Sequence, residues 1–424
     1  MKSKETNNTN VPKLRFPEFL EAEVWEEKCL GQIGEFIGGG TPDTSISEYW
    51  DGEIQWFTPT EIKERNLFKS KRTITEKGLY NSSAKLLPQG ALLITTRATI
   101  GDIGIANIPC ATNQGFQSLL TYDSEVNFFW YYWFIQHKNE LISKASGSTF
   151  PEIGKTEIVK ILTLRPKKKE QQKIASCLSS LDDIITAQSQ KLETLKAHKK
   201  GLMQQLFPAE GETVPKLRFS EFRKAGKWKK KTLKEVSKLI SEKAGDRKYT
   251  LMSINAGIGL VSQIEKFGRE IAGDAYKNYI VIHKEDFAYN KSSTKFYPEG
   301  QIAMLENAEI GAVPNSIFTC FRVNLELIFP FFLKYLFEGN NHGKWLKKFI
   351  VIGARAHGAL NVDNKDFFSL PIFFPNLSEQ QKIADCLSSL DDLISAQSQK
   401  LDALKTHKNG LMQQLFPNIN NTNK

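Results

Sequence analysis

The sequence has no long apolar run and few cysteines. Its longest apolar stretch, the aromatic-rich segment from Phe128 to Ile135, is far shorter than the roughly 18–20 residues that a membrane-spanning helix needs. The first residues carry no apolar core of the kind found in secretory signal peptides. The five cysteines lie far apart and form no C-x-x-C pair for zinc or redox chemistry. We therefore expect a soluble, reduced, cytoplasmic protein that has no membrane partner.

Two cofactor-binding motifs are present only in part. Phe36-Ile-Gly-Gly-Gly40 fits the F-x-G-x-G pattern of S-adenosylmethionine-dependent methyltransferases, but the Asn/Asp-Pro-Pro-aromatic motif of adenine methyltransferases is missing, since the chain has no Pro-Pro dipeptide. Gly154-Lys155-Thr156 resembles the end of a phosphate-binding loop, which also needs a glycine five residues before its last glycine. Thr149 stands at that position. We therefore expect no cofactor in this chain.

Signatures of hydrolytic or metal-dependent catalysis are also incomplete. Pro42-Asp43 with Glu61 and Lys63 satisfies the loose outline of a metal-dependent nuclease, but E-x-K is common in charged chains and the second half has no counterpart. The six histidines show no H-E-x-x-H or other clustered ligand spacing, and there is no G-x-S-x-G elbow. The sequence predicts no catalytic residue and no metal site.

What the chain does have is length, ordinary hydrophobic content and excess positive charge. Its 424 residues, of which 40% are hydrophobic, are enough for two or three domains with cores of their own. Lys and Arg number 57 against 47 acidic residues, for a net charge of +10. This excess is compatible with a nucleic-acid partner but does not by itself establish one.

An internal repeat is the most informative feature of the sequence. Residues 170–208 and 379–417 are identical at 32 of 39 positions, at a fixed offset of 209. A shorter tag, V-P-K-L-R-F, begins at Val11 and again at Val214. The intervening regions share little obvious sequence. The predicted organisation is a tag at 1–19, a variable region at 20–165, a helix at 166–208, a linker and second tag at 209–222, a second variable region at 223–375, a second helix at 376–417 and a tail at 418–424.

Each long repeat has the pattern of a coiled-coil helix. Its apolar positions step alternately by four and three residues, the 3.5-residue period of a coiled-coil seam. Gln188 and Gln397 occupy equivalent seam positions, where a polar residue can fix the register. The predicted seam comprises Ile174, Leu178, Leu181, Ile185, Gln188, Leu192, Leu195 and Leu202, with Ile383, Leu387, Leu390, Ile394, Gln397, Leu401, Leu404 and Leu411.

The two helices are expected to pair with each other as an antiparallel two-helix coiled coil. A helix of about 37 residues spans roughly 55 Å, so the pair would be a spacer between two globular regions. The segment 206–215 looks like the two chain ends joined, which favours a cyclic, pseudo-twofold organisation. The alternative is that each helix packs separately on its own domain.

Both variable regions read as α+β domains, because short β-rich runs alternate with turn signals. Toward its end each region carries an aromatic-rich helix candidate, a small-residue loop and a last strand before the long helix. The order of parts matches, whereas the side chains differ, as expected for two recognition modules of one fold. These candidate elements are 128–139, 145–149 and 158–164 in the first region and 331–348, 353–358 and 370–374 in the second.

Basic and polar loop residues are the candidates for binding nucleic acid. Lys and Arg side chains neutralise phosphates, and loop side chains can donate hydrogen bonds to base edges. The basic run at 223–234 can contact phosphates or can be a solvated loop, and the sequence leaves both open. The candidate residues are Thr41, Lys71, Arg72, Thr96, Arg97, Ser148, Thr149, Lys229, Lys230, Lys291, Ser292, Lys295, Arg355 and His357.

The layout resembles the DNA-specificity (S) subunit of type I restriction-modification enzymes. Two unlike α+β regions, each followed by a near-identical helix with E-Q-Q-K-I-A-x-C-L-S-S-L-D-D, carry the resemblance over essentially the whole chain. Gly39-Gly-Thr-Pro42, Gly101 and Asn113-Gln-Gly-Phe116 agree with the family's target-recognition domains. The second region lacks the Gly-Gly-Thr-Pro element, so its loop contacts are carried over less safely.

The resemblance implies a function in a restriction system and in DNA methylation. Each variable region would be a target-recognition domain for one half of a split site in double-stranded DNA, and the paired helices would set the distance between the halves. The helices would also dock two methyltransferase subunits, joined by restriction/translocase subunits. S-adenosylmethionine, ATP and Mg would belong to those partners, and this chain would be non-catalytic.

Two other readings remain open from the residues alone. One is a non-catalytic coiled-coil adaptor whose two domains bind protein or glycan partners. The other is a stand-alone methyltransferase. Steep salt dependence of binding would separate DNA binding from an apolar protein contact, and methyl transfer by the purified chain would reveal an enzyme.

Overall fold

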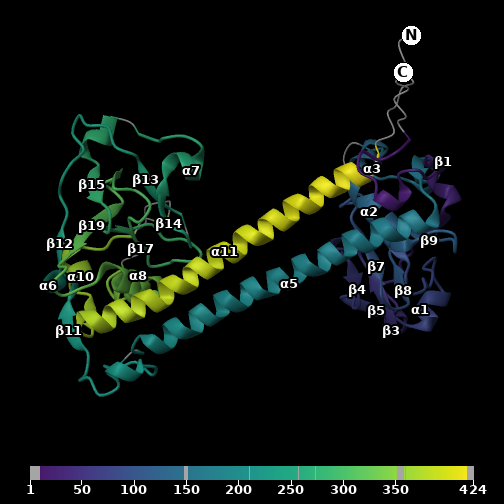
Figure 1. The fold of residues 1–424 in the computed structure, drawn as a ribbon. Helices are drawn as coiled ribbons and strands as arrows, with labels where there is room; N and C mark the ends of the chain where they lie inside the picture. The colour runs from purple at the N-terminus through teal and green to yellow at the C-terminus, as the bar shows by residue number, and fades with distance from the viewer. Residues whose placement is uncertain are drawn as a thin grey trace, which may run out of the picture. The chain divides into compact units, whose positions relative to one another are not determined.

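The computed structural model describes residues 10–147, 151–209, 211–255, 257–272, 274–350, 358 and 360–417. The chain divides into two compact units, and Figure 1 shows their ribbon with many of the elements labelled. The first unit is Met1–Ser189 with Gln399–Lys424, and the second is Gln190–Ser398. Each of the two long helices therefore contributes one part to each unit.

The first unit is built from three sheets and several short helices. Its strands are β1 (Glu26–Cys29), β2 (Gly34–Gly38), β3 (Trp50–Phe57), β4 (Asn66–Leu67), β5 (Arg72–Ile74), β6 (Leu92–Ile94), β7 (Ile103–Ala106), β8 (Cys110–Thr112), β9 (Gln117–Thr121) and β10 (Leu162–Arg165). Its helices are α1 (Glu76–Tyr80), α2 (Asn127–Gln136), α3 (Lys138–Ser143), α4 (Lys155–Ile158) and the first part of α5 (Lys168–Leu206).

The second unit has a similar inventory. Its strands are β11 (Lys229–Thr232), β12 (Ser237–Leu239), β13 (Met252–Asn255), β14 (Gly259–Ser262), β15 (Ile280–His283), β16 (Phe287–Asn290), β17 (Gln301–Met304), β18 (Ile310–Val313), β19 (Phe318–Val323) and β20 (Pro371–Phe374). Its helices are α6 (Leu233–Val236), α7 (Gln263–Phe267), α8 (Pro330–Glu338), α9 (Asn341–Leu346), α10 (Asn364–Phe368) and the first part of α11 (Leu377–Leu415). The 3-10 turns of the two units are at Pro17–Phe19, Leu30–Gln32, Ser47–Tyr49, Pro59–Glu61, Ser220–Phe222 and Asp274–Asn278.

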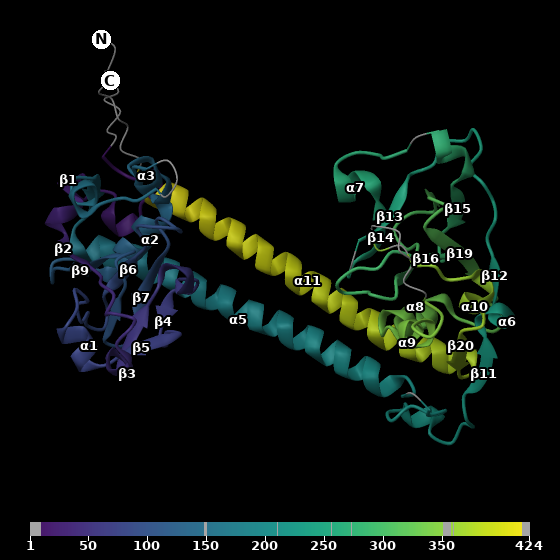
Figure 2. The same ribbon diagram turned by 180° about the vertical axis from the view of Figure 1, so that it is seen from behind.

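The main sheets of the two units share the order of four strands despite their different sequences, and the first unit adds a fifth strand, β4. The main sheet runs β2-β9-β6-β7-β4 in the first unit and β12-β19-β16-β17 in the second. A small antiparallel pair, β1-β10 or β11-β20, joins the start of each variable region to the strand that precedes the long helix. Figure 2 shows both units from behind. The predicted α+β class, with two long helices, is confirmed.

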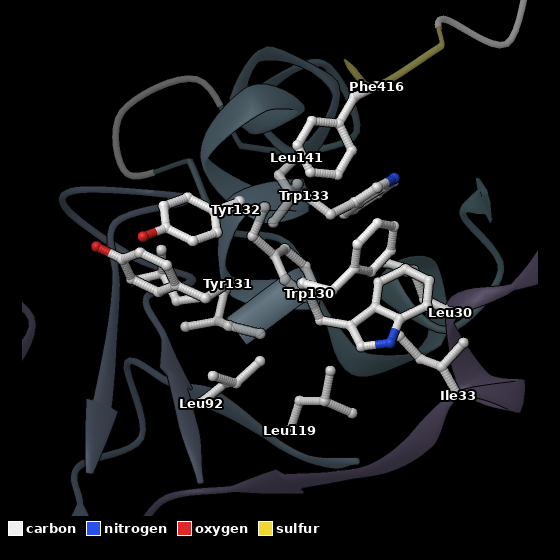
Figure 3. Close-up of a cluster of buried hydrophobic side chains, with 14 of the residues drawn as sticks. Leu30, Ile33, Leu92, Leu119, Trp130, Tyr131, Tyr132, Trp133, Leu141 and Phe416 are labelled. Carbon is white, nitrogen blue, oxygen red and sulfur yellow. The ribbon is translucent and has the colours of Figure 1, made fainter. Parts of the chain in front are cut away.

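The first unit's core forms around α2. Six consecutive residues of this helix, Phe129 to Phe134, are buried, as expected for a helix that is apolar on all sides. Figure 3 shows Trp130, Tyr131, Tyr132 and Trp133 of this helix in one cluster with Leu92 and Leu119 of the sheet. Phe416, which follows α11, packs against Phe129 with ring centroids 5.3 Å apart. The end of α11 is therefore part of this core.

The long helices run antiparallel within each unit. In the first unit, Lys408 of α11 donates to Asp182 of α5 at 2.5 Å. In the second, Lys199 of α5 donates to Asp391 of α11 at 2.6 Å. A step of 17 residues along α5 is matched by a step of 17 in the opposite direction along α11. One antiparallel register therefore holds in both units.

The predicted seam positions are buried or half-buried on both helices, and Ile174, Leu178, Ile383 and Leu387 lie in the cores of their units. Ile174, Leu178, Leu192, Ile383, Leu387, Gln397 and Leu401 are buried, and the other predicted seam residues are half-buried: Leu181, Ile185, Gln188, Leu195, Leu202, Leu390, Ile394, Leu404 and Leu411. The burial follows the 3.5-residue period that the sequence showed.

Three local predictions are wrong. The helix expected over 128–139 is interrupted at His137, a non-helical residue (φ −102°, ψ 20°) that ends α2 and precedes α3. The single helix expected over 331–348 is two helices, because Asn340 adopts a left-handed conformation (φ 56°) that ends α8 and starts α9. The strand expected over 158–164 begins only at Leu162, since Lys155–Ile158 forms the helical turn α4. In each case the apolar residues were recognised, but the change of backbone conformation within the segment was missed.

His342 of α9 makes the second unit's stability depend on pH. Its side chain is fully buried, and its Nε2–H donates to the carbonyl of Gly300 at 3.1 Å. Burial lowers the pKa of His342 from 6.5 to about 4. The unfolded chain therefore binds the proton first as pH falls, so the stability present above about pH 6.5 is lost as pH drops toward 4.

We expect a His342→Met substitution to remove this dependence. The wild type's unfolding free energy, relative to that of the variant, should fall by about 3 kcal/mol between pH 7 and pH 4. Urea unfolding at a series of pH values measures the difference. A difference that stays constant with pH would show that His342 does not titrate as its burial requires.

Candidate nucleic-acid interface

Four loops of the first unit meet at one end of its sheets. The amide of Gly40 donates to the carbonyl of Thr112 at 2.8 Å, and the amide of Asn113 donates to the carbonyl of Phe57 at 3.1 Å. The amide of Thr96 donates to the carbonyl of Gly115, also at 2.8 Å. The loops that follow β2, β3 and β6 are thereby tied to the loop between β8 and β9.

The Gly-Gly-Thr-Pro element is explained by close backbone packing. A Cβ atom on Gly39 would lie 2.0 Å from the carbonyl oxygen of Asn113, and one on Gly40 would lie 2.2 Å from the Ser83 hydroxyl. Only glycine fits at either position. The next residue, Thr41, is half-buried and donates its hydroxyl to Gln114 at 2.5 Å. The glycines therefore position Thr41 and Gln114 at the loop surface.

Arg97 is the exposed basic residue of the loop after β6. It precedes Ala98, which has a positive φ of 60°, and its Nε lies 2.8 Å from Glu152. Both side chains of this pair are substantially exposed, so the ion pair is weak and the guanidinium can exchange it for another anion. The adjacent Thr96 is only 1% exposed, so its side chain is not at the surface.

Lys71 and Arg72 are linked to the same loops through Glu61. The carboxylate of Glu61 accepts from the amide of Lys71 at 2.6 Å and from the amide of Thr58 at 2.8 Å. Arg72 lies over the ring of Trp50 at 3.5 Å from its centroid, which fixes the guanidinium plane. Both basic residues are exposed.

The second unit repeats the backbone hydrogen bonds that hold the Thr96 loop, and we call this shared pattern the backbone frame; the side chains on it differ. The amide of Lys291 donates to the carbonyl of Ile317, and the carbonyl of Lys291 accepts from Leu360, both at 2.8 Å. In the first unit Thr96 makes the same two bonds, to Gly115 and from Ile153. Lys291 therefore takes the place of Thr96, and Ser292 that of Arg97.

The polarity of this second loop differs from that of the first. Lys291 is half-buried, and desolvation lowers its pKa. Ser292 is half-buried beside the side chain of Asn290, which accepts from its amide at 3.1 Å. Lys295 is exposed. A partly desolvated lysine gains more from an incoming anion than a fully hydrated one does.

The remaining predicted site residues lie elsewhere. Lys229 and Lys230 are exposed on β11, which pairs with β20 in a sheet separate from the one that carries β16 and β19. Lys230 lies over the ring of Phe373 at 5.6 Å. Ser148, Thr149, Arg355 and His357 lie outside the residues that the structure describes.

Sequence reasoning missed the residues that attach each tag to its long helix. Arg15 makes a two-pronged pair with Glu170, with both nitrogen–oxygen distances 2.8 Å. Arg218 and Glu379 make the same pair, at 2.6 Å. The signal was in the sequence, because both copies of the tag carry this arginine and both copies of the long repeat begin with this glutamate.

A second missed set ties each aromatic helix to both long helices. The hydroxyl of Tyr132 donates to Asp182 at 2.6 Å, and that of Tyr335 donates to Asp391 at 2.8 Å. Each aspartate also accepts from the lysine of the other long helix, as described above. These lysines lie over the same tyrosine rings, at 5.2 Å and 5.0 Å. The recognition regions are thus fixed to the helices by matched contacts.

Metal ligands and membrane-spanning helices were sought in the described part of the chain. Within the part of the chain that the structure describes, no three His, Cys, Asp or Glu residues are grouped so as to hold a metal ion. The described helices include none that is both long and apolar enough to cross a membrane.

Comparison with known proteins places these observations in context. The family described as "Type I restriction modification DNA specificity domain" matches residues 22–197 and 225–406. The MjaIX specificity subunit of Methanocaldococcus jannaschii is 37% identical over 42% of this chain, and the EcoR124I/EcoR124II specificity subunit of Escherichia coli is 27% identical over 40%. These two matches span 44% and 43% of the relatives' own lengths.

Longer matches are more distant. The MjaVIII specificity subunit of M. jannaschii is 22% identical over 97% of this chain and 96% of its own length. The crystal structure of a type I restriction-modification S subunit from M. genitalium covers 96% of this chain and 100% of its own, with a TM-score of 0.58 and 16% identity. At that identity the structural match supports the fold alone.

Proposed function

Since this chain belongs to the type I restriction-modification DNA specificity family, as its repeats indicated, we propose that it is the sequence-specific DNA-binding subunit of such a complex. Each unit would read one half of a bipartite site. One observation carries this proposal: the two units hold their loops in the same backbone frame and present different side chains there. Thr96 and Arg97 in one unit correspond to Lys291 and Ser292 in the other.

The chemistry of the loops fits double-stranded DNA. Arg97 offers the planar, two-pronged donor that pairs with guanine in the major groove, and its present partner Glu152 is weakly held. Lys71, Lys291 and Lys295 supply charges that neutralise phosphates. The excess of ten positive charges over the whole chain favours approach to DNA.

The long helices would set the distance between the two half-sites. Each has 39 residues and is therefore about 58 Å long. The Asp182–Lys408 and Asp391–Lys199 pairs hold one register, and each is joined to the recognition region of its own unit by a tyrosine. These ties oppose sliding of one helix along the other, as a spacer requires.

We propose that the outward faces of the helices dock two methyltransferase subunits, which restriction/translocase subunits join. Ile184 is 47% exposed and Leu393 is 55% exposed, and the two are equivalent positions of the repeat. A matched pair of exposed apolar residues fits two copies of one partner. S-adenosylmethionine, ATP and Mg would bind those partners, this chain would be non-catalytic, and the complex would act in the cytoplasm.

Mapping methylated adenines across the genome, with and without this chain, tests the proposal. We expect one split motif to be methylated and to lose its methylation when the chain is deleted. An unchanged methylation map would contradict a role in site selection. Methyl transfer by the purified chain alone would contradict its non-catalytic role, and salt-insensitive binding of the complex to DNA would contradict phosphate contacts.

A further inference from the structure

The loop that follows β16 in the second unit contains an insertion relative to its counterpart in the first. The amide of Gly101, which has a φ of +82°, donates to the carbonyl of Thr95. Gly300 has a φ of +84° and packs so closely that a Cβ would lie 2.4 Å from the carbonyl of Asn290. These glycines close equivalent loops, which span six residue steps in the first unit and ten in the second.

The inserted residues form a tight turn. The amide of Thr294 donates to the carbonyl of Tyr297, and the amide of Tyr297 donates to the hydroxyl of Thr294, both at 3.0 Å. Lys295 and Phe296 are therefore the tip of the turn, and Phe296 is 76% exposed. A single exposed apolar residue is ordinary on a protein surface. Here, however, the exposed phenylalanine stands at the tip of an inserted turn that is closed by its own hydrogen bonds.

The base of this loop is held firmly. The buried hydroxyl of Tyr289 donates to the carbonyl of Glu299 at 2.8 Å, and His342 donates to the carbonyl of Gly300. On the other side, the amide of Ser293 donates to the carbonyl of Gly358 at 2.6 Å. Because both ends are anchored, the backbone that carries Phe296 has less conformational freedom to lose on binding.

We propose that Phe296 is a wedge that stacks against, and partly separates, bases of the half-site read by the second unit. This inference rests on the proposed function. The loop is the counterpart of the one that carries Arg97 in the first unit. Lys295 precedes the phenylalanine in the chain and Lys291 begins the same loop, so both add positive charge suited to phosphates. Apolar wedges that unstack base steps are an established way for proteins to distort DNA.

The first unit carries no such wedge at the equivalent place. Its shorter loop has Arg97 and Ala98 at the tip, and alanine is too small to fill the space between two bases. We therefore expect the two half-sites to be read differently: the first through Arg97 without a wedge from this loop, and the second with Phe296 inserted. A wedge should therefore affect only the half-site read by the second unit, whereas a general surface residue should affect neither half-site.

The test uses the complex assembled with its methyltransferase subunits and DNA carrying the mapped site, with 2-aminopurine placed at successive positions of each half. This base fluoresces more strongly when it is unstacked. Phe296→Ala should bind about tenfold more weakly and lose the fluorescence rise at the second unit's half-site, whereas the first half-site stays unchanged. Phe296→Trp should retain both properties, since it preserves an aromatic face.

Leu325→Ala is the matched control, because Leu325 is 63% exposed and follows β19 at the end of that strand opposite Ile317 and Phe318. It should leave binding and fluorescence unchanged. Binding by Phe296→Ala equal to that of the wild type would overturn the wedge, and so would impaired assembly with the methyltransferase in the absence of DNA. If the wild-type complex itself failed to select any site, the proposed function would fail as well.

Discussion

Replacing Glu379 with alanine should destabilise the second unit by about 3–5 kcal/mol, the usual cost of removing one partner of a buried ion pair. Glu379 is fully buried, and both of its oxygens accept from Arg218 at 2.6 Å. Arg218 also donates to the carbonyls of Ala225 and Gly226. Without the carboxylate, a nearly buried guanidinium would keep its charge and lose its counter-charge. Denaturant unfolding of the full chain measures the loss.

A double variant can separate the cost of the unpaired, nearly buried Arg218 charge from the cost of lost packing. An Arg218→Leu, Glu379→Leu double variant should recover part of the stability, because no charge remains buried. Glu193→Ala removes an exposed pair with Lys196 on α5 and should change stability by less than about 0.5 kcal/mol. An effect of Glu379→Ala as small as that of Glu193→Ala would show that the tag is not anchored by this pair.

A matched heptad inserted into both long helices should change the DNA site that the complex methylates. The register places the midpoint between Gln190 and Lys191 in α5 and between Gln399 and Lys400 in α11. Insertion there keeps the seam and both Asp–Lys pairs. Seven residues add about 10 Å, which corresponds to about three base pairs of B-DNA. Methylation mapping should show the same two half-sites with a spacer longer by about three base pairs.

A control insertion isolates the effect of helix length. The same heptad placed after Gly211, in the exposed linker that follows α5, lengthens the chain equally without lengthening either helix. It should leave the spacer unchanged. Methylation of the original spacer by the helix-insertion variant would contradict the proposed role of the helices in setting the spacing.

The long helices were the part of the fold most accessible from the sequence. Their apolar period is a local property, so the buried and half-buried positions from Ile174 to Leu411 could be predicted from spacing alone. The shared architecture of the variable regions followed from the matched order of their parts. The break at Asn340 did not, because a single left-handed residue between two aromatic helices leaves no periodic signal.

The candidate site was accessible only in part. The loop containing Arg97 was recognisable as polar and exposed, and so was the one containing Lys295. The burial of Thr96 was not accessible from the sequence. It depends on the segment around Gly115, just before β9, whose carbonyl accepts from the amide of Thr96. The wedge at Phe296 was equally hidden, because a phenylalanine in a sequence is more often part of a core.

The sequence by itself determined that the chain is a duplicated pair of modules on coiled-coil helices, because periodicity and repetition are properties of neighbouring residues and fixed offsets. Only the tertiary structure decided which loops meet and which charges pair. Arg15 reaches Glu170 across 155 residues, and Gly39 packs on Asn113, because strand order brings them together. Contacts between distant residues depend on strand order and register, and one sequence carries no direct record of either.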